Sequence, residues 1–312
     1  MRNFLIGSAI ALACAAMLPM LVQAEYYYVL GFTVLQLIIM ATAWNILGGF
    51  AGYVNFGAGA FFAVGAYAAV SLYKAFALPL GWQILAGAAM AGLLGLGVGL
   101  LTLRLRGIFF SIATIAITII LETVVLNWTY VGGAKGLPIL RPTEIPLFGN
   151  YTQWLFFVMA MIAVFAVGVA RYIQTSWIGR GLRAIRDNEG AAECSGVPTL
   201  KLKLAAATIS GALMGAAGAP YALLGSFIEP SSAFSLNHAV NALAMPIIGG
   251  TAHWLGPVIG ALLLGSVQQI VTVTISSEIN VLVVGVMLVI FVVAAPEGIL
   301  GLFNKFFQKG RK

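Results

Sequence analysis

Charged residues are scarce in this sequence. Asp, Glu, Lys and Arg make up 8% of its 312 residues, whereas 61% are hydrophobic. An ordinary soluble domain carries about 25% charged residues, and its core could not take up so many apolar side chains. The composition therefore excludes a typical soluble protein and indicates one that crosses a lipid bilayer several times.

Motifs for catalysis and nucleotide binding are absent as well. The sequence has no Gly-x-x-x-x-Gly-Lys-Ser/Thr loop to hold nucleotide phosphates, and no His-Glu-x-x-His, Gly-x-Ser-x-Gly or cysteine–histidine cluster. His238 and His253 are too far apart for a zinc-site spacing. We therefore expect no enzymatic activity, no metal and no cofactor.

Cysteine is nearly absent, with two residues in the chain. Cys14 lies in the first apolar run and Cys194 in a polar stretch between runs, so the two thiols are predicted at different depths and cannot pair. The cytosol also keeps thiols reduced. We expect both cysteines to act as small filler side chains.

Long apolar runs occupy most of the sequence. Seven of them approach the roughly 20 residues that a helix needs to cross about 30 Å of hydrocarbon; they are 29–47, 54–73, 82–103, 108–126, 152–170, 204–226 and 281–300. Three less regular runs are 4–22, 239–251 and 257–275. We therefore predict an all-α polytopic membrane protein, a single transmembrane domain over residues 1–312 with about ten spanning helices and both termini in the cytoplasm.

The basic residues between these runs set the predicted orientation. With ten spans, only Lys74, Lys135 and Arg141 would face outward. The basic residues that would face the cytoplasm are Arg2, Arg104, Arg106, Arg171, Arg180, Arg183, Arg186, Lys201, Lys203, Lys305, Lys309, Arg311 and Lys312. This asymmetry satisfies the positive-inside rule. The net charge of +7 therefore reports orientation and not nucleic-acid binding, which would need a soluble basic face with interleaved aromatics.

The first segment is open to two interpretations. Arg2, an apolar run and Val22-Gln23-Ala24 resemble a cleavable signal peptide. The alternative is a retained first helix, which the length of the run favours. Removal of residues 1–24 would leave every later span in the same orientation, so topology does not decide between them.

Two polar segments are long enough to have roles of their own. Residues 127–151, predicted as a periplasmic loop, contain Pro138, Pro142 and Pro146, and repeated prolines prevent a continuous helix. This loop is either a connector with interfacial aromatics or a docking surface for an external partner. Residues 171–203, predicted as a cytoplasmic loop, are the densest polar stretch in the chain.

Within the cytoplasmic stretch, residues 179–193 predict a short amphipathic helix. Leu182, Ile185 and Ala192 are apolar at helical spacing, and three acids are interspersed among the arginines. A basic helix lying on an anionic leaflet has no use for those acids. The mixed charge therefore favours contact with a protein partner.

Few polar residues lie inside the predicted spans. Asn45 and Asn55 flank the glycine-rich Gly48–Gly52 stretch. This stretch is either a tight turn between two helices, the simpler interpretation, or a broken helix lining a cavity. Mid-span acids and bases are almost absent, whereas ion-driven carriers usually keep such groups there. Transport would then need a downhill gradient or a partner that supplies energy.

Three blocks of this sequence resemble the permease subunits of branched-chain amino acid ABC importers, the LivM type of the LivH/LivM group. The first is Trp44-Asn45-Ile46-Leu47-Gly48-Gly49-Phe50-Ala51-Gly52, followed by Gly57, Phe61-Phe62 and Gly65-Ala66-Tyr67. The second is Arg104–Thr114 with Gly132-Gly133 and Gly136-Leu137, and the third is Gly179–Glu193, continued by Ser210-Gly211-Ala212 and Gly215–Gly218. Ile248-Gly249-Gly250 and Gly256–Ala261 also fit. In combination these matches are specific for the family.

The resemblance implies a partner on each side of a bacterial inner membrane. In such permeases the cytoplasmic segment is a coupling helix that docks on the ATP-binding subunit, and here its docking residues would be Arg180, Arg183, Arg186, Asp187, Glu189 and Glu193. The periplasmic face, including 127–151, would receive a substrate-loaded binding protein. The implied complex has a second permease of the same family and two ATP-binding subunits, and ATP would switch the pore between outward- and inward-facing states.

One departure from the family's pattern bears on the substrate. Asn55 and Ala58 stand where the family commonly has serine and a histidine or similar polar residue. Together with Asn45, these residues would border the translocation path. The resemblance implies transport of branched-chain or related hydrophobic amino acids, whereas related permeases carry urea, short amides or aromatic acids. A channel or facilitator that works without partners is the alternative from another class.

Overall fold

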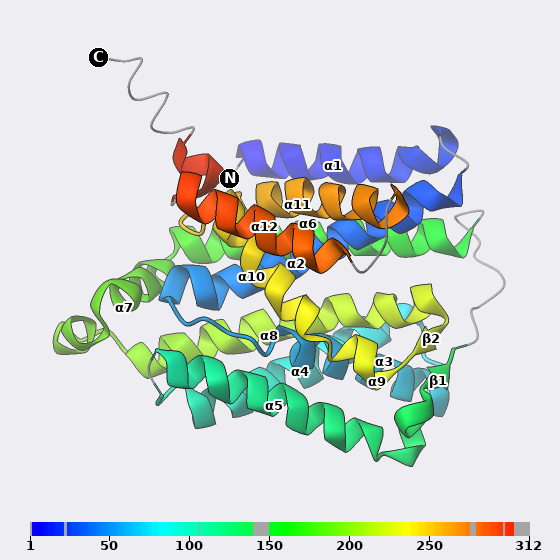
Figure 1. Cartoon of the computed structure of the whole chain (residues 1–312), viewed down its shortest axis with the longest axis horizontal. Helices are drawn as coiled ribbons and strands as arrows, with labels where there is room; N and C mark the ends of the chain where they lie inside the picture. The colour runs from blue at the N-terminus through cyan, green and yellow to red at the C-terminus, as the bar shows by residue number, and fades with distance from the viewer. Residues whose placement is uncertain are drawn as a thin grey trace.

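A computed structural model describes residues 2–21, 24–105, 107–139, 150–274, 279–295 and 297–302. Its long helices run roughly side by side along one direction (Figure 1), which confirms the predicted all-α fold. The helices are α1 (Arg2–Leu21), α2 (Glu25–Ala51), α3 (Ala58–Phe76), α4 (Leu80–Thr102), α5 (Ile108–Leu126), α6 (Tyr151–Thr175), α7 (Trp177–Cys194), α8 (Thr199–Gly225), α9 (Pro230–Ala233), α10 (Leu236–Gly249), α11 (Gly256–Thr274) and α12 (Ile279–Ala294).

Within the described part of the chain, seven helices are long and apolar enough to cross a membrane. They are Glu25–Ala51, Ala58–Phe76, Leu80–Thr102, Ile108–Leu126, Tyr151–Thr175, Thr199–Gly225 and Val281–Leu302. Two shorter apolar helices, Ile6–Pro19 and Gly256–Thr272, fall on the predicted runs 4–22 and 257–275. α10 has 14 residues, about 21 Å of helix, which is less than the roughly 30 Å of hydrocarbon. The polytopic helical fold is confirmed, and the number ten stays a prediction.

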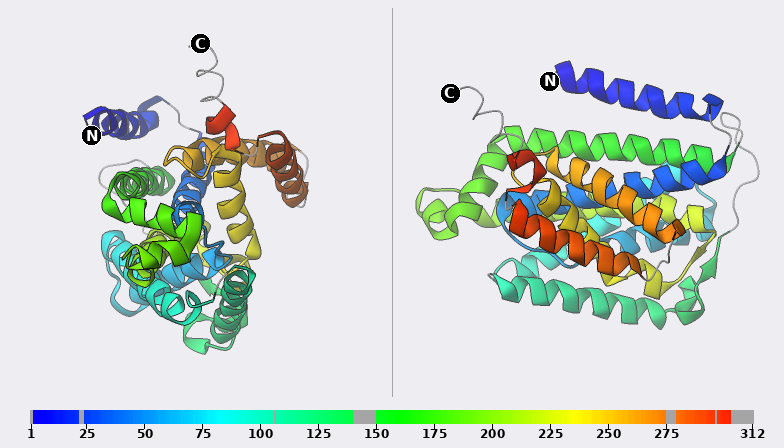
Figure 2. Two further views of the ribbon diagram at one scale, coloured as in Figure 1. Left: turned by 90° about the vertical axis from the view of Figure 1, so that its left-hand side faces the viewer. Right: turned by 45° about the horizontal axis from the view of Figure 1, so that its top comes forward.

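The two ends of the bundle contain different elements. α7 projects at one end, which we call the α7 end (Figure 1). The other end, the sheet end, carries a small antiparallel sheet of β1 (Leu137–Pro138) and β2 (Phe227–Ile228). α1 starts at the α7 end and residues 297–302 also lie there (Figures 1 and 2), an arrangement compatible with both termini on one side of a membrane.

Three of the basic residues used in the orientation argument can be assigned to one end of the bundle. Lys74 is at the sheet end, where its Nζ donates to the Tyr130 carbonyl at 2.8 Å. Arg171 and Lys203 belong to helices that reach the α7 end. Some of the basic residues used in the orientation argument lie outside the described residues. They are Arg106, Arg141, Lys305, Lys309, Arg311 and Lys312, and the side chain of Arg2 is not described either.

Glycines allow α3, α4 and α8 to pack with their backbones in contact. A Cβ added to Gly65 on α3 would collide with the backbone of Gly215 on α8. A Cβ on Gly215 would lie 2.5 Å from the Gly87 carbonyl oxygen on α4. Small residues that let backbones approach are the usual means of helix association in lipid. These contacts allow α3, α4 and α8 to approach one another closely.

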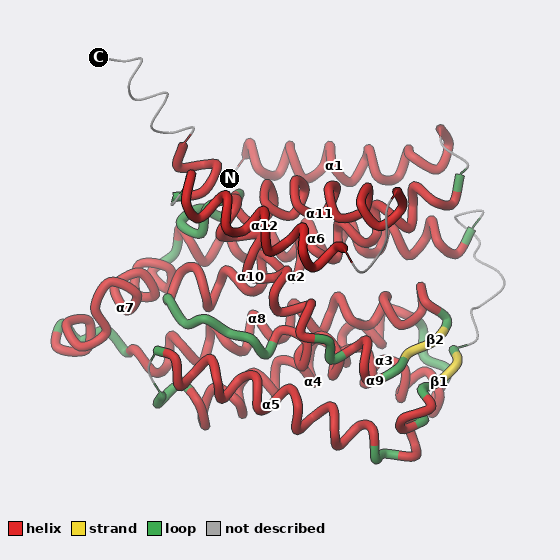
Figure 3. Tube along the Cα trace, viewed as in Figure 1, coloured by secondary structure: helices red, strands yellow, loops and turns green. Residues whose placement is uncertain are grey.

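Two long helices are each followed by an irregular segment that runs back along the bundle. α2 ends at Ala51, and residues 52–57 are non-helical before α3 begins at Ala58. Figure 3 shows this stretch passing between α8 and α5. At the sheet end, α8 ends at Gly225, and residues 226–235 contain β2 and α9 before α10 begins. The glycine-rich Gly48–Gly52 stretch thus forms the end of α2, and an irregular segment follows it in place of the tight turn that was the simpler interpretation.

The predicted periplasmic loop is only partly described. Residues 127–139 contain two short 3-10 helices, Thr129–Val131 and Gly133–Lys135, followed by β1, which agrees with the expected lack of a continuous helix. Residues 140–149, with Pro142 and Pro146, lie outside the described residues.

Candidate functional site at the junction of α7 and residues 52–57

α7 is an amphipathic helix with a break near its end. Its buried residues include Leu182, Ile185 and Ala192, the three positions whose spacing predicted the inner face. Asn188 interrupts the helix with φ −162° and ψ 105°. Its side-chain oxygen accepts a hydrogen bond from the Ala191 backbone N–H at 3.0 Å, so it caps the second part of the helix.

The six residues predicted for docking divide into two groups. Arg180, Arg183 and Asp187 are exposed, and the two arginines make only long contacts of 3.4–3.5 Å to carbonyls at the end of α6. The other three bond within the chain. Arg186 donates from Nη1 to the Gly49 carbonyl at 2.6 Å, and Glu193 accepts from the Thr199 hydroxyl at 2.7 Å.

Glu189, the sixth of these residues, forms a buried ion pair with Lys203 on α8. The Lys203 Nζ lies 2.5 Å from Glu189 Oε1, and the side chains are 4% and 14% exposed. Lys203 also donates to the Leu103 carbonyl at 3.0 Å and to the Tyr53 hydroxyl at 3.1 Å. All three ammonium protons therefore have acceptors, as a buried lysine requires.

Tyr53 completes this cluster from the irregular segment. Its hydroxyl donates to Glu189 Oε2 at 2.7 Å, and the Lys203 Nζ lies 4.8 Å from the centroid of its ring. The cluster of Tyr53, Glu189 and Lys203 thus connects α7 to α8, to the end of α4 and to residues 52–57. We call it the junction cluster.

The backbone of residues 52–57 is held by side chains from α2 and α5. Trp44 Nε1 donates to the Asn55 carbonyl at 2.7 Å. On α5, Ser111 Oγ donates to the Val54 carbonyl at 2.8 Å, and Thr114 Oγ1 accepts from the Phe56 N–H at 3.1 Å. Irregular backbone at membrane depth is tolerated only where such groups are satisfied by protein or water.

The three residues predicted to border the translocation path are buried. Asn55 is 2% exposed, and its Oδ1 accepts from the Gly57 N–H at 2.7 Å just before α3. Asn45 donates from Nδ2 to the Thr251 carbonyl at 3.2 Å, while its buried Oδ1 has no partner in the structure. Ala58 is fully buried at the start of α3. Asn45 and Asn55 therefore bond to different parts of the chain and do not form one site.

A cavity of about 420 Å³ with both polar and apolar lining lies between α7, residues 52–57 and the start of α5. Its lining residues are Ala51, Gly52, Tyr53, Val54, Gly107, Ile108, Ser111, Ile185, Arg186 and Glu189. The cavity therefore includes two of the predicted docking residues, Arg186 and Glu189, and also Ser111, which holds the irregular segment from α5. Within the described residues, no group of three or more His, Cys, Asp and Glu side chains could hold a metal.

Sequence reasoning missed the main partners at this junction. Lys203 was treated as one of many cytoplasmic charges, and Tyr53 and Trp44 as part of the glycine-rich block. One signal was available for Lys203: it directly precedes the apolar run 204–226, and ionisable residues in a transmembrane helix usually have a partner.

Comparison with known proteins gives the family of the chain. Residues 26–292 match the model of the branched-chain amino acid transport system / permease component family. The high-affinity branched-chain amino acid transport system permease proteins LivM of Escherichia coli and Salmonella typhimurium are 26% and 27% identical to it, over 84% of this chain and 67% of each relative. A probable branched-chain amino acid transport permease protein LivH of Methanocaldococcus jannaschii is 25% identical over 61% of this chain and 63% of its own. No solved structure matches significantly. The break after α2 and the polar junction beneath α7 thus occur in a multi-pass membrane protein that belongs to the branched-chain amino acid transport system permease component family.

Proposed function

We propose that the chain is a membrane-spanning permease subunit of a binding-protein-dependent ABC importer of the bacterial inner membrane. Its substrates would be branched-chain or related hydrophobic amino acids. It would work with a second permease of the same family, two cytoplasmic ATP-binding subunits that contact α7, and a periplasmic binding protein at the sheet end.

The observation that carries this proposal is the two-sided arrangement of α7. Charges of both signs, Arg180, Arg183 and Asp187, are exposed on α7, where an ATP-binding subunit could contact them. On the inner side, Arg186 and Glu189 bond to the chain on either side of Gly52. A partner that moves α7 would therefore act directly on residues 52–57.

The cavity between α7 and α5 supports a second permease subunit. Ile108, which lines the cavity, is 76% exposed, so the cavity lies next to the outer surface of α5. A polar group such as the Ser111 hydroxyl is costly to leave beside hydrocarbon. A partner subunit packed against α5 would cover the cavity and convert it into part of a closed path.

ATP would drive transport in this proposal through different contacts in two states. A partner shifts a conformational equilibrium only by its differential affinity for the two states. Nucleotide-dependent movement of the ATP-binding subunits would displace α7, and the junction cluster would transmit the displacement to residues 52–57. Asn55 and Ala58, at the start of α3, would then move with the wall of the path.

Two alternatives to this proposal can be tested with an uptake assay. The substrate could be urea, a short amide or an aromatic acid, because the binding protein usually selects the substrate in this class. The chain could also be a facilitator that needs no partner. Competition of unlabelled urea, acetamide and phenylacetate with labelled leucine in the uptake assay would separate the substrate classes.

The decisive test reverses the exposed charges of α7. The double variant Arg180→Glu/Arg183→Glu is co-expressed with the second permease and the ATP-binding subunits, and co-purification and ATP-dependent leucine uptake into proteoliposomes are measured. Lys201→Glu is the matched control, since Lys201 is also an exposed cation at the α7 end. We expect the double variant to lose both readouts and the control to keep them.

Unchanged co-purification and uptake in the double variant would contradict the assignment of α7. Uptake that persists when the ATP-binding subunits are omitted would support the facilitator.

A further inference from the structure

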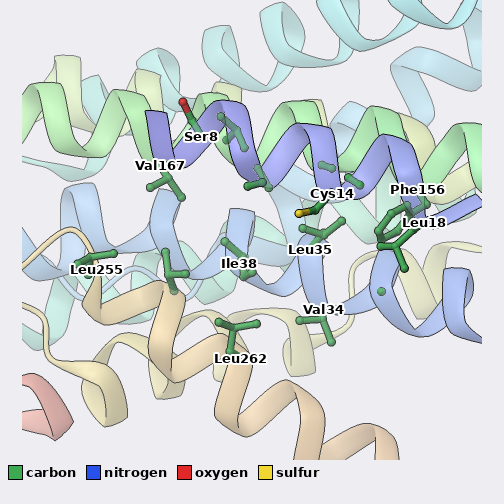
Figure 4. Close-up of a pocket in the computed structure, with 18 of the residues that line it drawn as sticks. Ser8, Cys14, Leu18, Val34, Leu35, Ile38, Phe156, Val167, Leu255 and Leu262 are labelled. Atoms are coloured by element: carbon green, nitrogen blue, oxygen red, sulfur yellow. The ribbon is translucent and has the colours of Figure 1, made fainter. Parts of the chain in front are cut away.

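An apolar groove runs along α1 on the side of the molecule away from the junction cluster. In Figure 2, α1 lies at the rim of the bundle beside α6. The groove has a volume of about 650 Å³ and is lined by α1, α2, α6, α11 and the turn before α11. Figure 4 shows Cys14 and Leu18 on α1, with Leu35 and Ile38 on α2 across from them. Its lining is almost entirely apolar.

The length of the groove suits a single lipid chain. Its lining on α1 extends from Phe4 to Leu18, about 21 Å along a helix. One leaflet of a bilayer contributes roughly 15 Å of hydrocarbon, half of the core thickness. An acyl chain that enters at one end of the groove is therefore fully accommodated along α1.

A positive charge lies at the α7 end of this groove. The Arg171 guanidinium carbon lies 4.7 Å from the centroid of the Phe4 ring and 5.3 Å from that of Trp254, and both rings line the groove. No acidic side chain in the described part of the chain forms an ion pair with Arg171. Nearby, partial burial and then the positive charge of Arg171 lower the pKa of His253.

These observations specify the chemistry of an occupant. The aromatic rings fix the planar face of Arg171 and leave its donors available for an anion. Basic pockets between transmembrane helices on the cytoplasmic side are suited to anionic lipid head groups. We propose that the groove binds one anionic phospholipid, with an acyl chain along α1 and the phosphate at Arg171. This site is separate from the junction cluster and does not depend on the transported substrate.

The test measures lipid binding to the purified complex by native mass spectrometry, with phosphatidylglycerol and phosphatidylcholine titrated separately. Arg171→Gln is compared with Arg104→Gln, which removes an exposed charge at the same end but away from the groove. A basic residue near an anionic surface contributes about 1 kcal/mol, so Arg171→Gln should weaken phosphatidylglycerol binding about fivefold. Arg104→Gln and the phosphatidylcholine series should show no such change.

A second variant blocks the groove without changing any charge. Gly7 lines the groove, and a Cβ at this position meets no atom within 4 Å, so the backbone there accepts a side chain and Gly7→Phe should occupy the acyl site. We expect it to lose the same tightly bound phosphatidylglycerol. A photoactivatable phosphatidylglycerol should cross-link to residues of α1, α6 or α11 that face the groove.

Equal loss in Arg171→Gln and Arg104→Gln, equal binding of phosphatidylcholine, or cross-links confined to other faces would overturn the proposal. A cross-link from Cys14 to a partner subunit would also overturn it, because a protein helix would then fill the groove.

Discussion

The α7 end and the sheet end hold their irregular segments by different means. At the α7 end, residues 52–57 depend on side chains, chiefly Trp44, Ser111 and the junction cluster. At the sheet end, residues 226–235 are tied by backbone pairing, with the Ile139 N–H donating to the Ser226 carbonyl at 2.9 Å. A junction made of side chains on several helices can respond to a partner that touches one of them. Backbone pairing between two strands does not respond in this way. We therefore infer that the α7 end changes conformation when a partner binds, whereas the sheet end stays fixed.

The largest expected effect comes from removing Lys203. Lys203→Met leaves the Glu189 carboxylate with the Tyr53 hydroxyl but without a cation in a nearly buried position, and breaking such an ion pair from one side costs about 3–5 kcal/mol. We expect a marked fall in the melting temperature of the purified complex.

The double variant Lys203→Met/Glu189→Gln provides the control for that loss. It removes both charges together, so much of the lost stability should return. Equal melting temperatures for the single variant and the wild type would mean that the ion pair is not a structural part of the α7 end.

A smaller loss is expected from Trp44→Phe. The substitution keeps an aromatic side chain but removes the donor to the buried Asn55 carbonyl, which costs about 1–3 kcal/mol. Trp128→Phe at the sheet end, where the indole is 51% exposed, should change stability by less than about 0.5 kcal/mol. Chemical unfolding of both variants in one detergent checks the difference, and equal losses would remove the contrast between the ends.

The corresponding cation at the sheet end should matter less than Lys203. Lys74 is exposed, and its Nζ lies 4.7 Å from the centroid of the Tyr130 ring. Exposed cation–π contacts contribute about 0.5–1 kcal/mol, so Lys74→Met should lower stability by no more than that. A loss as large as that of Lys203→Met would show that charge holds both ends equally.

The smallest effect concerns the titration of His253 in the turn before α11. Burial, together with the positive charge of Arg171, lowers its pKa below the usual 6.5. Because the folded-state pKa is depressed, the stability tied to the neutral ring is lost as the pH falls below the unfolded-state value. The chain has two histidines, so selective isotope labelling gives two NMR signals to titrate. Arg171→Gln should raise the pKa of His253, and an unchanged value would contradict this cause.

The positions of most long helices could be predicted from the sequence. The run 108–126 coincides with α5, and 82–103 nearly coincides with α4 (Leu80–Thr102), because hydrophobicity and length suffice for a spanning helix. The run 54–73 began too early, since α3 starts at Ala58. Apolar composition does not distinguish a non-helical segment from a helix. Residues 52–57 can remain non-helical because side chains of α2 and α5 form hydrogen bonds with their backbone groups.

The site was harder to predict because it depends on which way each charge faces. Lys201 and Lys203 look alike in the sequence, yet two residues on a helix are about 200° apart. Lys201 is therefore exposed while Lys203 is buried. The break at Asn188 likewise changes the direction of the chain between Asp187 and Glu189. The spacing of Lys201 and Lys203 does not say which of the two is buried, and it does not predict the break at Asn188. One docking surface was therefore predicted where α7 has an outer and an inner face.

The central claim is that the junction cluster transmits motion from α7 to residues 52–57. Tyr53→Phe tests it most directly, because it removes the hydroxyl shared by Glu189 and Lys203 but keeps the ion pair and the ring. Tyr172→Phe is the control, since Tyr172 is a 60% exposed tyrosine at the same end.

The measurement is the ratio of substrate imported to ATP hydrolysed by the complete transporter in proteoliposomes. Coupling residues of this kind contribute about 0.5–2 kcal/mol, so Tyr53→Phe should lower the ratio by about two- to thirtyfold. ATP hydrolysis itself should continue, and Tyr172→Phe should keep the wild-type ratio. A wild-type ratio in Tyr53→Phe would contradict the account.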